Sequence, residues 1–426
     1  QVPVSSGAPH FKGGSTPYVP QAVIVDLCGM NKIINISRQQ RMAIIEPGVT
    51  YGQLQEALAK EGLTLATSLA PRASKSVLTS ILEIEPRLNC VHQFNYTEPL
   101  RCTEVTFGDG NQIFTGEAGG GPKDLYAQLD AEKYQVMSNG PNMTDQLRMI
   151  TQAQGSMGIV TWASVKCELL PTISKMYLAP AAKSTDLEDF VYKTIRVRFS
   201  DKLFVMNKAY LANLLGETPS AIVDLKKELP NWVAAVGITG DILLPEMKVS
   251  AQEQDIADFA QETGVHFLSK VPGATGEQVL AKSTTPSAGT FWKKTLKGAF
   301  LDIFFVTTLD QTSKFIAVMN EMAIAAGYPT EDIGVYIQPQ HMGTSVHLEF
   351  NLPYNAENVK EAKMVKELYT KASKEMSKLG GFYARPYDIW ANIQLNKDAQ
   401  SYSLLKEMKH IYDPNNIMNT GKLTLR

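Results

Sequence analysis

The sequence predicts an α+β protein built from two packed parts, and three observations lead to that prediction. The chain has 426 residues, more than one compact core usually holds, so two domains or one domain with a large insertion are expected. The first 170 residues are dense in short β-like runs separated by turn signals. From about residue 172, strands and helices alternate in two similar blocks. That order predicts an antiparallel sheet layered with helices, of ferredoxin-like βαββαβ texture.

The first part, residues 1–171, is expected to form strands and one clear helix. β-rich runs stand at 22–27, 42–48, 101–116 and 157–170, and the third reads as a hairpin because Gly-Asp-Gly-Asn at 108–111 is a strong turn signal. Residues 50–62 predict a helix that Thr50 caps and Gly62 ends. Its apolar face is expected to carry Tyr51, Leu54, Leu58 and Ala59.

The second part, residues 172–378, is expected to supply the antiparallel layer. Its predicted helices include 245–263, 311–326 and 355–379, and its β-rich runs include 265–270, 300–308 and 332–338. The last segment, residues 379–426, contains a predicted helix at 400–411, which Pro414 stops, and then a polar tail without hydrophobic period.

Composition excludes several classes of function. The net charge is −2, from 41 basic and 43 acidic residues, so no basic surplus argues for nucleic acid. The four cysteines form no C-x-x-C pair, which argues against an iron–sulfur or structural zinc site, and no metal is expected. The longest apolar runs are strand-length and cannot span a bilayer. No signal peptide is visible, so a cytoplasmic location is expected.

Two glycine-rich stretches could face an anion or a nucleotide. VPVSSGAPHFKGGSTP, at 2–17, is a run of small residues whose N–H groups can curl into an anion-binding nest, although neither the Walker nor the G-x-G-x-x-G pattern is present. GSMG, at 155–158, leads into a β-branched strand and lets a backbone approach something closely. An ordinary surface loop and an ordinary turn remain the alternatives.

Two later stretches carry candidate chemistry. Arg385 stands among aromatic residues in LGGFYARPYDIW, which suits a planar anion, and a core arginine paired with an acid is the alternative. His347 and Glu349 are two residues apart in a β-rich run, so they lie on the same face of the strand. They could be a base and the acid that orients it, or half of a metal site. A merely polar strand face is the alternative.

Taken together, these stretches resemble the vanillyl-alcohol oxidase / p-cresol methylhydroxylase (PCMH-type) family of FAD-linked oxidases. The resemblance follows chain order through PGVTYGQLQEAL (47–58), SKSVLTSILEIEP (74–86), NGPNMTDQL (139–147), GSMGIVT (155–161), GGFYARPY (380–387) and DPNNIMNTGK (413–422). It covers about 1–170 and 375–426, and it is weak between them, where the family places its substrate cap. It implies a PCMH-type FAD-binding domain, a cap, and a C-terminus that returns to the FAD domain.

The resemblance also implies residue roles. The opening loop would wrap the FAD diphosphate, a second group would lie along the ribityl chain and flavin, a third would hold the adenosine half, and two C-terminal residues would close on the flavin. These cofactor residues are Ser5, Ser6, Gly7, Ala8, Pro9, His10, Gly13 and Gly14; Ser74, Ser76, Val77 and Ser80; Gly155, Ser156, Gly158, Ile159 and Val160; and Asn419 and Lys422. His10 is a candidate covalent tether, because some members attach FAD through a histidine in this loop, and a loop-capping histidine is the alternative.

Three departures from the family pattern bear on function. Ala384 stands where the family usually has a tyrosine, and Asn95 where it has an aspartate near the flavin, and both changes put a phenolic substrate in question. The metal motif of the hydroxy-acid branch is absent. The βα units that precede the diphosphate loop in the family are also absent from these 426 residues, so we expect them to be cleaved off, to lie outside this sequence or to come from a partner.

The resulting hypothesis is an FAD-dependent dehydrogenase or oxidase. Hydride would pass from an alcohol, hydroxy acid or benzylic carbon to flavin N5, with Arg385 orienting the substrate and His347, with Glu349, or Tyr383 accepting the proton. Electrons would leave to oxygen or to an iron–sulfur or cytochrome partner subunit, in an oligomer or hetero-complex. The alternatives are a non-catalytic flavin-binding subunit for assembly or electron relay, and an α+β protein without flavin.

Overall fold

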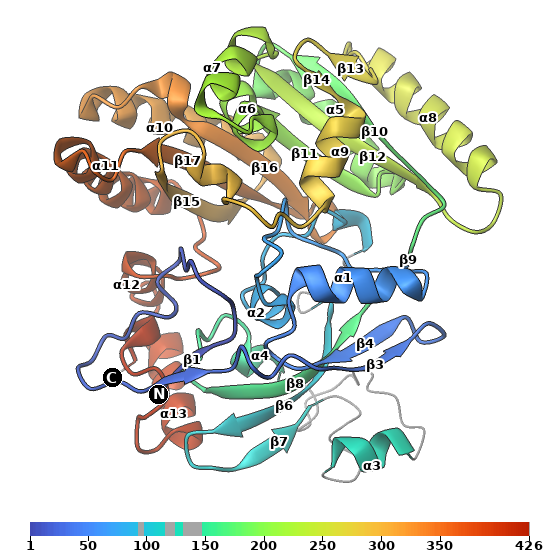
Figure 1. Ribbon diagram of the computed structural model, residues 1–426. Coiled ribbons are helices and arrows are strands. Elements are labelled where there is room, and N and C mark those ends of the chain that lie inside the picture. Colours follow the sequence, from blue (N-terminus) through green and yellow to red (C-terminus); the bar gives the residue numbers. More distant parts are fainter. Residues whose placement is uncertain (93–97, 116–123, 131–146, 426) are drawn as a thin grey trace.

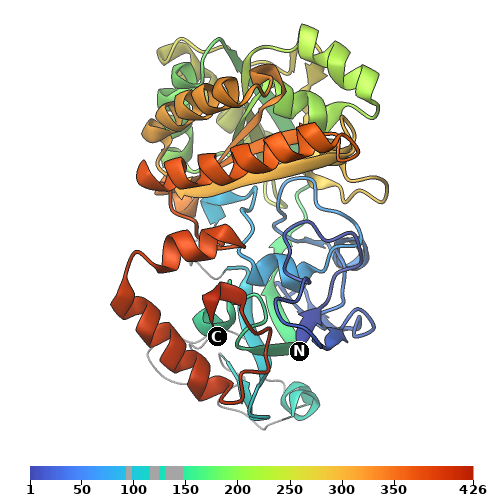
Figure 2. The ribbon, with the colours of Figure 1, turned by 90° about the vertical axis from the view of Figure 1, so that its left-hand side faces the viewer.

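The computed structural model describes residues 1–92, 98–115, 124–130 and 147–425. In this part of the chain, two layered units lie one above the other, as Figures 1 and 2 show. Asn95, the expected counterpart of the family aspartate, lies outside the described residues. So do residues 116–123 and 131–146, which include all but the last residue of NGPNMTDQL (139–147).

The lower unit is built on a five-stranded antiparallel sheet (Figure 1). In sheet order its strands are β3 (Ile33–Ser37), β4 (Met42–Ile45), β8 (Gly158–Lys166), β6 (Leu100–Phe107) and β7 (Gln112–Phe114). β6 and β7 form the predicted hairpin. Two smaller sheets accompany it: β1 (Val2–Val4) pairs in parallel with β2 (Ile24–Asp26), and β5 (Leu63–Thr64) pairs with β9 (Glu168–Leu169).

Short helices complete the lower unit: α1 (Tyr51–Lys60), α2 (Val77–Leu82), α3 (Leu125–Asp130) and α4 (Leu147–Ile150). α1 confirms the predicted helix, because Thr50 and Gln53 form a reciprocal capping box at its start. Tyr51, Leu54 and Leu58 are buried as expected. The prediction was wrong for Ala59, which is exposed, because it lies at the edge of the apolar stripe.

The upper unit, here called the cap, is built on a six-stranded antiparallel sheet. In sheet order its strands are β10 (Ile173–Ala181), β12 (Trp232–Gly240), β11 (Lys202–Asn207), β16 (Gly334–Gln340), β17 (Ser345–Tyr354) and β15 (Ala299–Thr307). Its halves are mirrored, since β10, β11 and β12 occupy places equivalent to β15, β16 and β17. This arrangement confirms the α+β class and the repeated strand–helix texture.

Helices cover both faces of the cap sheet. α5 (Glu188–Val197), α8 (Pro245–Glu262), α10 (Thr312–Ala326) and α11 (Val359–Lys378) contribute to one large apolar core, and α6 (Lys208–Leu215), α7 (Pro219–Glu228) and α9 (Gly276–Thr284) to a second core. The strand expected at 265–270 was wrong: only Lys270 enters the short β13 (Lys270–Val271), which pairs with β14 (Ala274–Thr275). Among the preceding residues, Leu268 forms an isolated bridge with Leu178, and Phe267 stacks on Tyr177 of β10.

Strand β17 sorts its side chains by alternation. Val346, Leu348, Phe350 and Leu352 belong to the large apolar core. His347, Glu349 and Asn351 therefore point to the opposite face of the sheet, which looks toward the lower unit. The strand thus delivers three polar side chains to one face while the other face holds the cap together.

The chain returns to the lower unit after the cap, as expected. α12 (Ile389–Leu395) and α13 (Ala399–Tyr412) lie beside the lower unit in Figure 2. The tail then meets the start of the chain, since the Asn419 amide donates to the Gln1 carbonyl at 2.7 Å. Lys422 Nζ donates to the Gly13 carbonyl at 2.7 Å, and Asn419 Nδ2 to the Gln154 carbonyl at 2.6 Å. These bonds hold the C-terminal tail against the first residues of the chain, against the opening loop and against Gln154.

The apolar side of β17 should carry much of the cap's stability. Leu348 is fully buried in the large core, so we expect Leu348→Ala to lower the free energy of unfolding by about 2–5 kcal/mol. Urea denaturation followed by tryptophan fluorescence would measure the loss. The control is Leu243→Ala, at a side chain that is 82% exposed, which should change stability by less than about 0.5 kcal/mol. Equal effects of the two substitutions would contradict the assignment.

Candidate active site

A large cavity lies between the lower unit and the polar face of the cap sheet. Its empty space measures about 1890 Å³, a volume that includes space open to solvent. Its lining includes parts of the opening loop, of residues 68–86, of residues 150–160, of residues 291–293, and of the cap strands β15, β16 and β17, together with Tyr210, Arg385 and Tyr387. Segments far apart in the sequence thus converge on one space.

The opening loop presents backbone donors without internal partners. Within the described ranges, no N–H group of residues 8–15 donates a hydrogen bond to any described residue (Pro9 has none to donate). His10, Phe11, Lys12, Gly14 and Ser15 line the cavity. The loop is fixed from behind, since the Gly7 amide donates to the Ser74 carbonyl at 3.3 Å and Ser6 Oγ accepts from the Ser76 amide at 3.1 Å. Free amides on a held loop suit an anion.

A second part of the cavity wall, at residues 155–158, requires glycine. Gly155 adopts a φ of +69°, and a Cβ there would lie 2.4 Å from Pro3 Cγ. At Gly158 a Cβ would lie 2.7 Å from the Thr106 carbonyl oxygen. The segment therefore packs directly against β1 and β6, which leaves backbone at the cavity surface.

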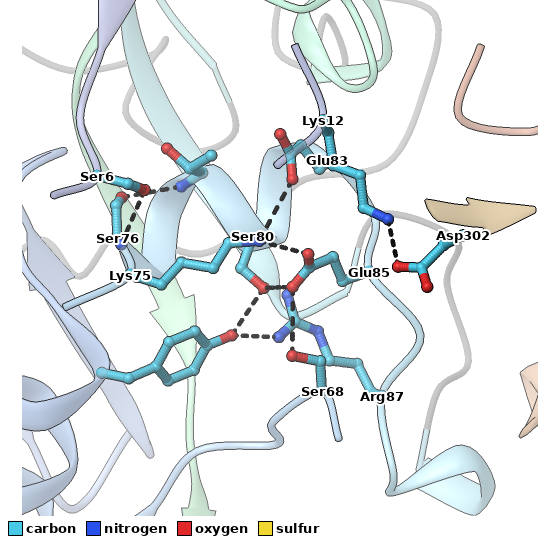
Figure 3. Close-up of polar contacts among 12 residues, drawn as sticks. Ser6, Lys12, Ser68, Lys75, Ser76, Ser80, Glu83, Glu85, Arg87 and Asp302 are labelled. Atoms are coloured by element: carbon cyan, nitrogen blue, oxygen red, sulfur yellow. Dashed lines mark hydrogen bonds and ion pairs between the residues drawn. The ribbon is translucent and has the colours of Figure 1, made fainter. Parts of the chain in front are cut away.

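The floor of the cavity contains a carboxylate that is fully occupied by its neighbours (Figure 3). Glu85 forms an ion pair with Lys75 and accepts hydrogen bonds from Ser80 Oγ at 2.6 Å and Ser68 Oγ at 3.2 Å. Burial would raise the pKa of Glu85, but Lys75, Arg385 and Ser80 hold it below its ordinary value. The series of hydrogen bonds continues from Ser80 to Tyr51. The Tyr51 hydroxyl donates to Ser80 Oγ at 2.8 Å and accepts from Arg87 Nη1 at 2.7 Å.

The cap face contributes a buried ionic cluster, defined here as Lys12, Lys293, Asp302 and Glu349. Lys293 Nζ bridges Asp302, at 2.9 Å, and Glu349. Lys12, from the opening loop, reaches the same Asp302 oxygen at 2.8 Å. Burial would raise the pKa of Glu349, but Lys293 and His347 keep it well below its ordinary value. Glu349 is therefore a fixed anion, which Tyr210 also contacts through its hydroxyl at 2.8 Å.

His347 stands beside this cluster as a neutral base. Burial lowers its pKa to about 4, and Arg385 acts in the same direction, although the neighbouring Glu349 opposes both. Its Nε2 lies 3.5 Å from Glu349 Oε2 and has no hydrogen-bond partner among the described residues. A buried imidazole that is neutral and faces a cavity can accept a proton.

Of the two residues predicted in the GGFYARPY stretch, Arg385 lines the cavity and Tyr383 does not. Arg385 lines the cavity and lies 4.0 Å from the centre of the Phe304 ring. Tyr383 does not reach the cavity wall: it stacks on Trp390 at 4.8 Å in the cap core and donates its hydroxyl hydrogen bond to the Ser373 carbonyl at 2.7 Å. Burial also raises its pKa. The expected role of Tyr383 as a proton acceptor is therefore corrected, because its hydroxyl faces protein rather than the cavity.

The expected cofactor residues divide into two groups. On the cavity wall the structure brings together Ser5, Ser6, His10, Gly14, Gly155, Gly158, Ile159 and Val160, in company with Arg385, His347 and Glu349. Away from the wall lie Gly7, Ala8, Pro9, Gly13, Ser74, Ser76, Val77, Ser80, Ser156, Asn419 and Lys422. Several of these act as supports: Ser76 caps α2, Ser80 holds Glu85, and Lys422 binds the loop at Gly13.

Sequence reasoning missed several charged residues of the wall: Lys12, Arg72, Lys75, Glu83, Glu85, Lys293 and Asp302. Asp302 left a signal, because it interrupts the apolar run FLDIFFV, where an unpaired acid would be costly. Lys12 stood inside the quoted opening stretch. Its partner is 290 residues away, and nothing local indicates that pairing.

The donor set of this cavity fits FAD. The unpaired loop amides can meet a diphosphate, and the glycine wall lets a flat group approach the backbone. Arg72 Nη1, Gln152 Nε2, Trp292 Nε1 and His347 Nε2 also line the cavity, and all four are buried without a hydrogen-bond partner in the described part of the chain. Buried polar atoms of this kind indicate a polar ligand.

Comparisons with known proteins agree with this fit. Residues 2–80 match the FAD binding domain family. Over 222 residues the chain is 28% identical to the 4-cresol dehydrogenase [hydroxylating] flavoprotein subunit of Pseudomonas putida, a match that covers 51% of this chain and 39% of that protein. The chain thus spans well under half the length of this curated relative.

Solved structures share the fold. The structure of p-cresol methylhydroxylase with substrate bound has a TM-score of 0.77 at 18% identity and covers 94% of this chain and 79% of that one. 4-Ethylphenol oxidase from Gulosibacter chungangensis, in its isoeugenol complex, gives 0.78 at 16%, covering 97% and 84%. Alkyldihydroxyacetonephosphate synthase gives 0.65 at 13%, covering 98% and 71%.

The class of protein that this architecture defines is a PCMH-type flavoprotein fold: an FAD-binding unit under an antiparallel cap, closed by the C-terminal segment. In sequence and fold the chain is similar to the p-cresol methylhydroxylase type of FAD-linked oxidases. Over the described residues, no three His, Cys, Asp or Glu side chains cluster as a metal site. No helix in the described ranges has both the length and the apolar character needed to cross a membrane.

The state of His347 predicts how stability depends on pH. The pKa of His347 is lowered from its ordinary value of 6.5 to about 4. Between pH 6.5 and about pH 4, this imidazole is therefore protonated in the unfolded chain but not in the folded one. The free energy of unfolding should therefore fall as the pH drops through this range, and His347→Gln should reduce the slope by up to about 1.4 kcal/mol per pH unit. Urea denaturation at a series of pH values measures it. His266→Gln, at an exposed site, should keep the parent slope, and an unchanged slope in His347→Gln would refute the burial of a neutral imidazole.

Proposed function

We propose that the protein is an FAD-dependent oxidoreductase that oxidises a C–H bond of an alcohol, hydroxy acid or benzylic substrate. The observation that carries the proposal is the meeting of two sites in one cavity. A loop with unpaired amides, inside the stretch that matches the FAD binding domain family, faces a cap that presents His347, Glu349 and Arg385. Bound FAD supplies the hydride acceptor.

The lower unit would bind the cofactor. The amides of residues 8–15 would hold the diphosphate, with Lys12 supplying positive charge at the loop. The backbone at Gly155, Gly158, Ile159 and Val160 would hold the adenosine half. Ser5 and Ser6 would line the path between them. His10 is exposed and lines the cavity, so it is our candidate for a covalent tether.

The cap would bind and deprotonate the substrate. Arg385 would orient an anionic group. For an alcohol, the hydroxyl proton would pass to the imidazole of His347, whose lowered pKa keeps it neutral at pH 7. Glu349, held by Lys293 and Tyr210, would orient the imidazole and stabilise its protonated form. The acid is fixed before the substrate arrives, so little reorganisation is needed.

The electrons would leave to a partner redox subunit or to oxygen. The curated relative is named as a flavoprotein subunit, and this supports a partner redox subunit for the present chain. A second candidate function is a non-catalytic flavin-binding subunit for assembly or relay. Ala384 favours it, because the family usually has a tyrosine at that place. Anaerobic mixing with benzyl alcohols and 2-hydroxy acids separates the two: flavin that no compound bleaches would favour the second candidate.

FAD binding should depend on the glycine wall. Gly155→Ala should weaken FAD binding about tenfold, because a side chain at φ +69° is strained and would press on Pro3. Titration of the apoprotein with FAD, followed by flavin fluorescence, measures it. Gly289→Ala is the matched control, since a Cβ there meets no atom within 4 Å. A parent protein that takes up no flavin would overturn the proposed function.

A separate experiment tests the covalent tether. Acid precipitation of the parent and of His10→Ala shows whether the flavin stays with the protein only when His10 is present.

The proton acceptor should control flavin reduction. With whichever alcohol or hydroxy acid of the panel bleaches the flavin, His347→Gln should slow reduction about 10²- to 10⁴-fold. Anaerobic stopped-flow absorbance measures the rate, and the visible spectrum of the variant verifies that FAD is still bound. The exposed His266→Gln serves as the control. A reduction rate within twofold or so of the parent would assign the base elsewhere.

A further inference from the structure

Two buried arginines on the cavity wall form no ion pair or hydrogen bond with an acid in the part of the chain that the structure describes. Arg72 is 9% exposed and Arg385 is 8% exposed. Neither guanidinium forms a hydrogen bond or an ion pair with any residue that the structure describes. Each instead lies over an aromatic ring: Arg72 is 5.1 Å from the centre of Phe11, and Arg385 is 4.0 Å from the centre of Phe304. A buried charge without a partner is costly, so its retention indicates an external anion.

The acids of the cavity cannot supply that anion. Glu85 is close enough to influence both arginines electrostatically, yet it is bound by Lys75, Ser80 and Ser68. Glu83 pairs with the same Lys75 at 3.4 Å. On the cap side, Lys293 joins Asp302 to Glu349, and Lys12 adds a second cation at Asp302. The lysines of the cavity wall thus form ion pairs with its acids, whereas Arg72 and Arg385 form none with the described residues.

The loop that carries Arg72 is bonded to the cap, although Arg72 also lies over Phe11 of the opening loop. The Ala70 amide donates to the Ser283 carbonyl at 2.7 Å, and the Ala73 amide to the Ser287 carbonyl at 2.8 Å. The Ser287 amide returns a bond to the Pro71 carbonyl at 3.0 Å. Arg72 is therefore held at the junction of the two units, on the side of the cavity to which the cap contributes.

An aromatic wall adjoins Arg72. It consists of Phe11, Phe291, Phe300, Trp292, Tyr210 and Tyr336, which all line the cavity. Phe11 stacks on Phe291 at 5.1 Å and contacts Phe300 at 5.2 Å, so the ring under Arg72 belongs to the wall. Trp292 Nε1 is buried without a partner in the described residues and adds one more donor. Aromatic faces next to a planar donor fork suit a flat ring that bears an acid.

We propose that Arg72 and Arg385 form an anion subsite that takes the carboxylate of an aryl acid, whose ring packs on this aromatic wall. The inference rests on the proposed function, because it makes that carboxylate part of the substrate. A carboxylate is ionised at neutral pH, whereas a phenol is not, so it matches two permanent charges better. The guanidinium fork can bind both carboxylate oxygens.

The test measures binding and needs no turnover. The FAD-loaded protein is titrated with benzoate and, as the neutral isostere, with benzamide, and calorimetry and the visible flavin spectrum report binding. Benzoate should bind at least about tenfold more tightly than benzamide. Arg72→Gln and Arg385→Gln should each weaken benzoate about 10- to 100-fold and leave benzamide within a few-fold of the parent. The exposed Arg196→Gln is the matched control and should change neither.

Retention of FAD distinguishes a substrate anion from a cofactor phosphate. Ultrafiltration of Arg72→Gln should show FAD held as tightly as in the parent. Loss of FAD together with unchanged benzoate affinity would assign Arg72 to the cofactor and overturn the proposal, as would equal binding of benzoate and benzamide. If the parent binds no FAD, the proposed function fails by itself. Calorimetry on that apoprotein then still decides the subsite, since a benzoate preference that Arg72→Gln abolishes would uphold it.

Discussion

The burial of four charged groups between the two units constrains the rest of the site. Lys293, Asp302 and Glu349 lie on the cap face, and Lys12 reaches them from the opening loop. Removing one member of a buried ionic group leaves a charge uncompensated, which typically costs about 3–5 kcal/mol. The loop and the cap must therefore keep one relative position for the charges to be satisfied. That position also places the opening loop and His347 on the wall of the same cavity.

The same constraint explains the character of His347. Glu349 would have to be protonated in so buried a place if Lys293 did not hold it ionised. Held as an anion, it sits 3.5 Å from an imidazole that burial keeps neutral. A neutral base beside a fixed anion can take up a proton, because the resulting cation gains a partner that is already present. The structural cluster and the candidate base are thus one electrostatic unit.

Local patterns in the sequence were sufficient for the elements that local interactions specify. The capping box of α1, the turn of the β6–β7 hairpin and the alternation of His347 and Glu349 on β17 all follow from neighbours in the chain. Tyr383 shows the limit. Phe382 pairs with Val306, but the Ala384 amide turns back to the Phe382 carbonyl at 2.9 Å, so alternation no longer tells which side Tyr383 and Arg385 face. Pairings such as Lys12 with Asp302 depend on the finished fold and leave no local pattern.

The unpaired arginines are a consequence of how completely the acids are satisfied. Glu85 acts on both arginines through space, but its oxygens are bound by Lys75, Ser80 and Ser68, while Arg87 supports Ser80 through Tyr51. Arg87 thus helps to fix the acid without touching the cavity. The positive character of the cavity is set by this relay of side chains beneath its floor, and not by an excess of charge in the chain, whose net value is only −2.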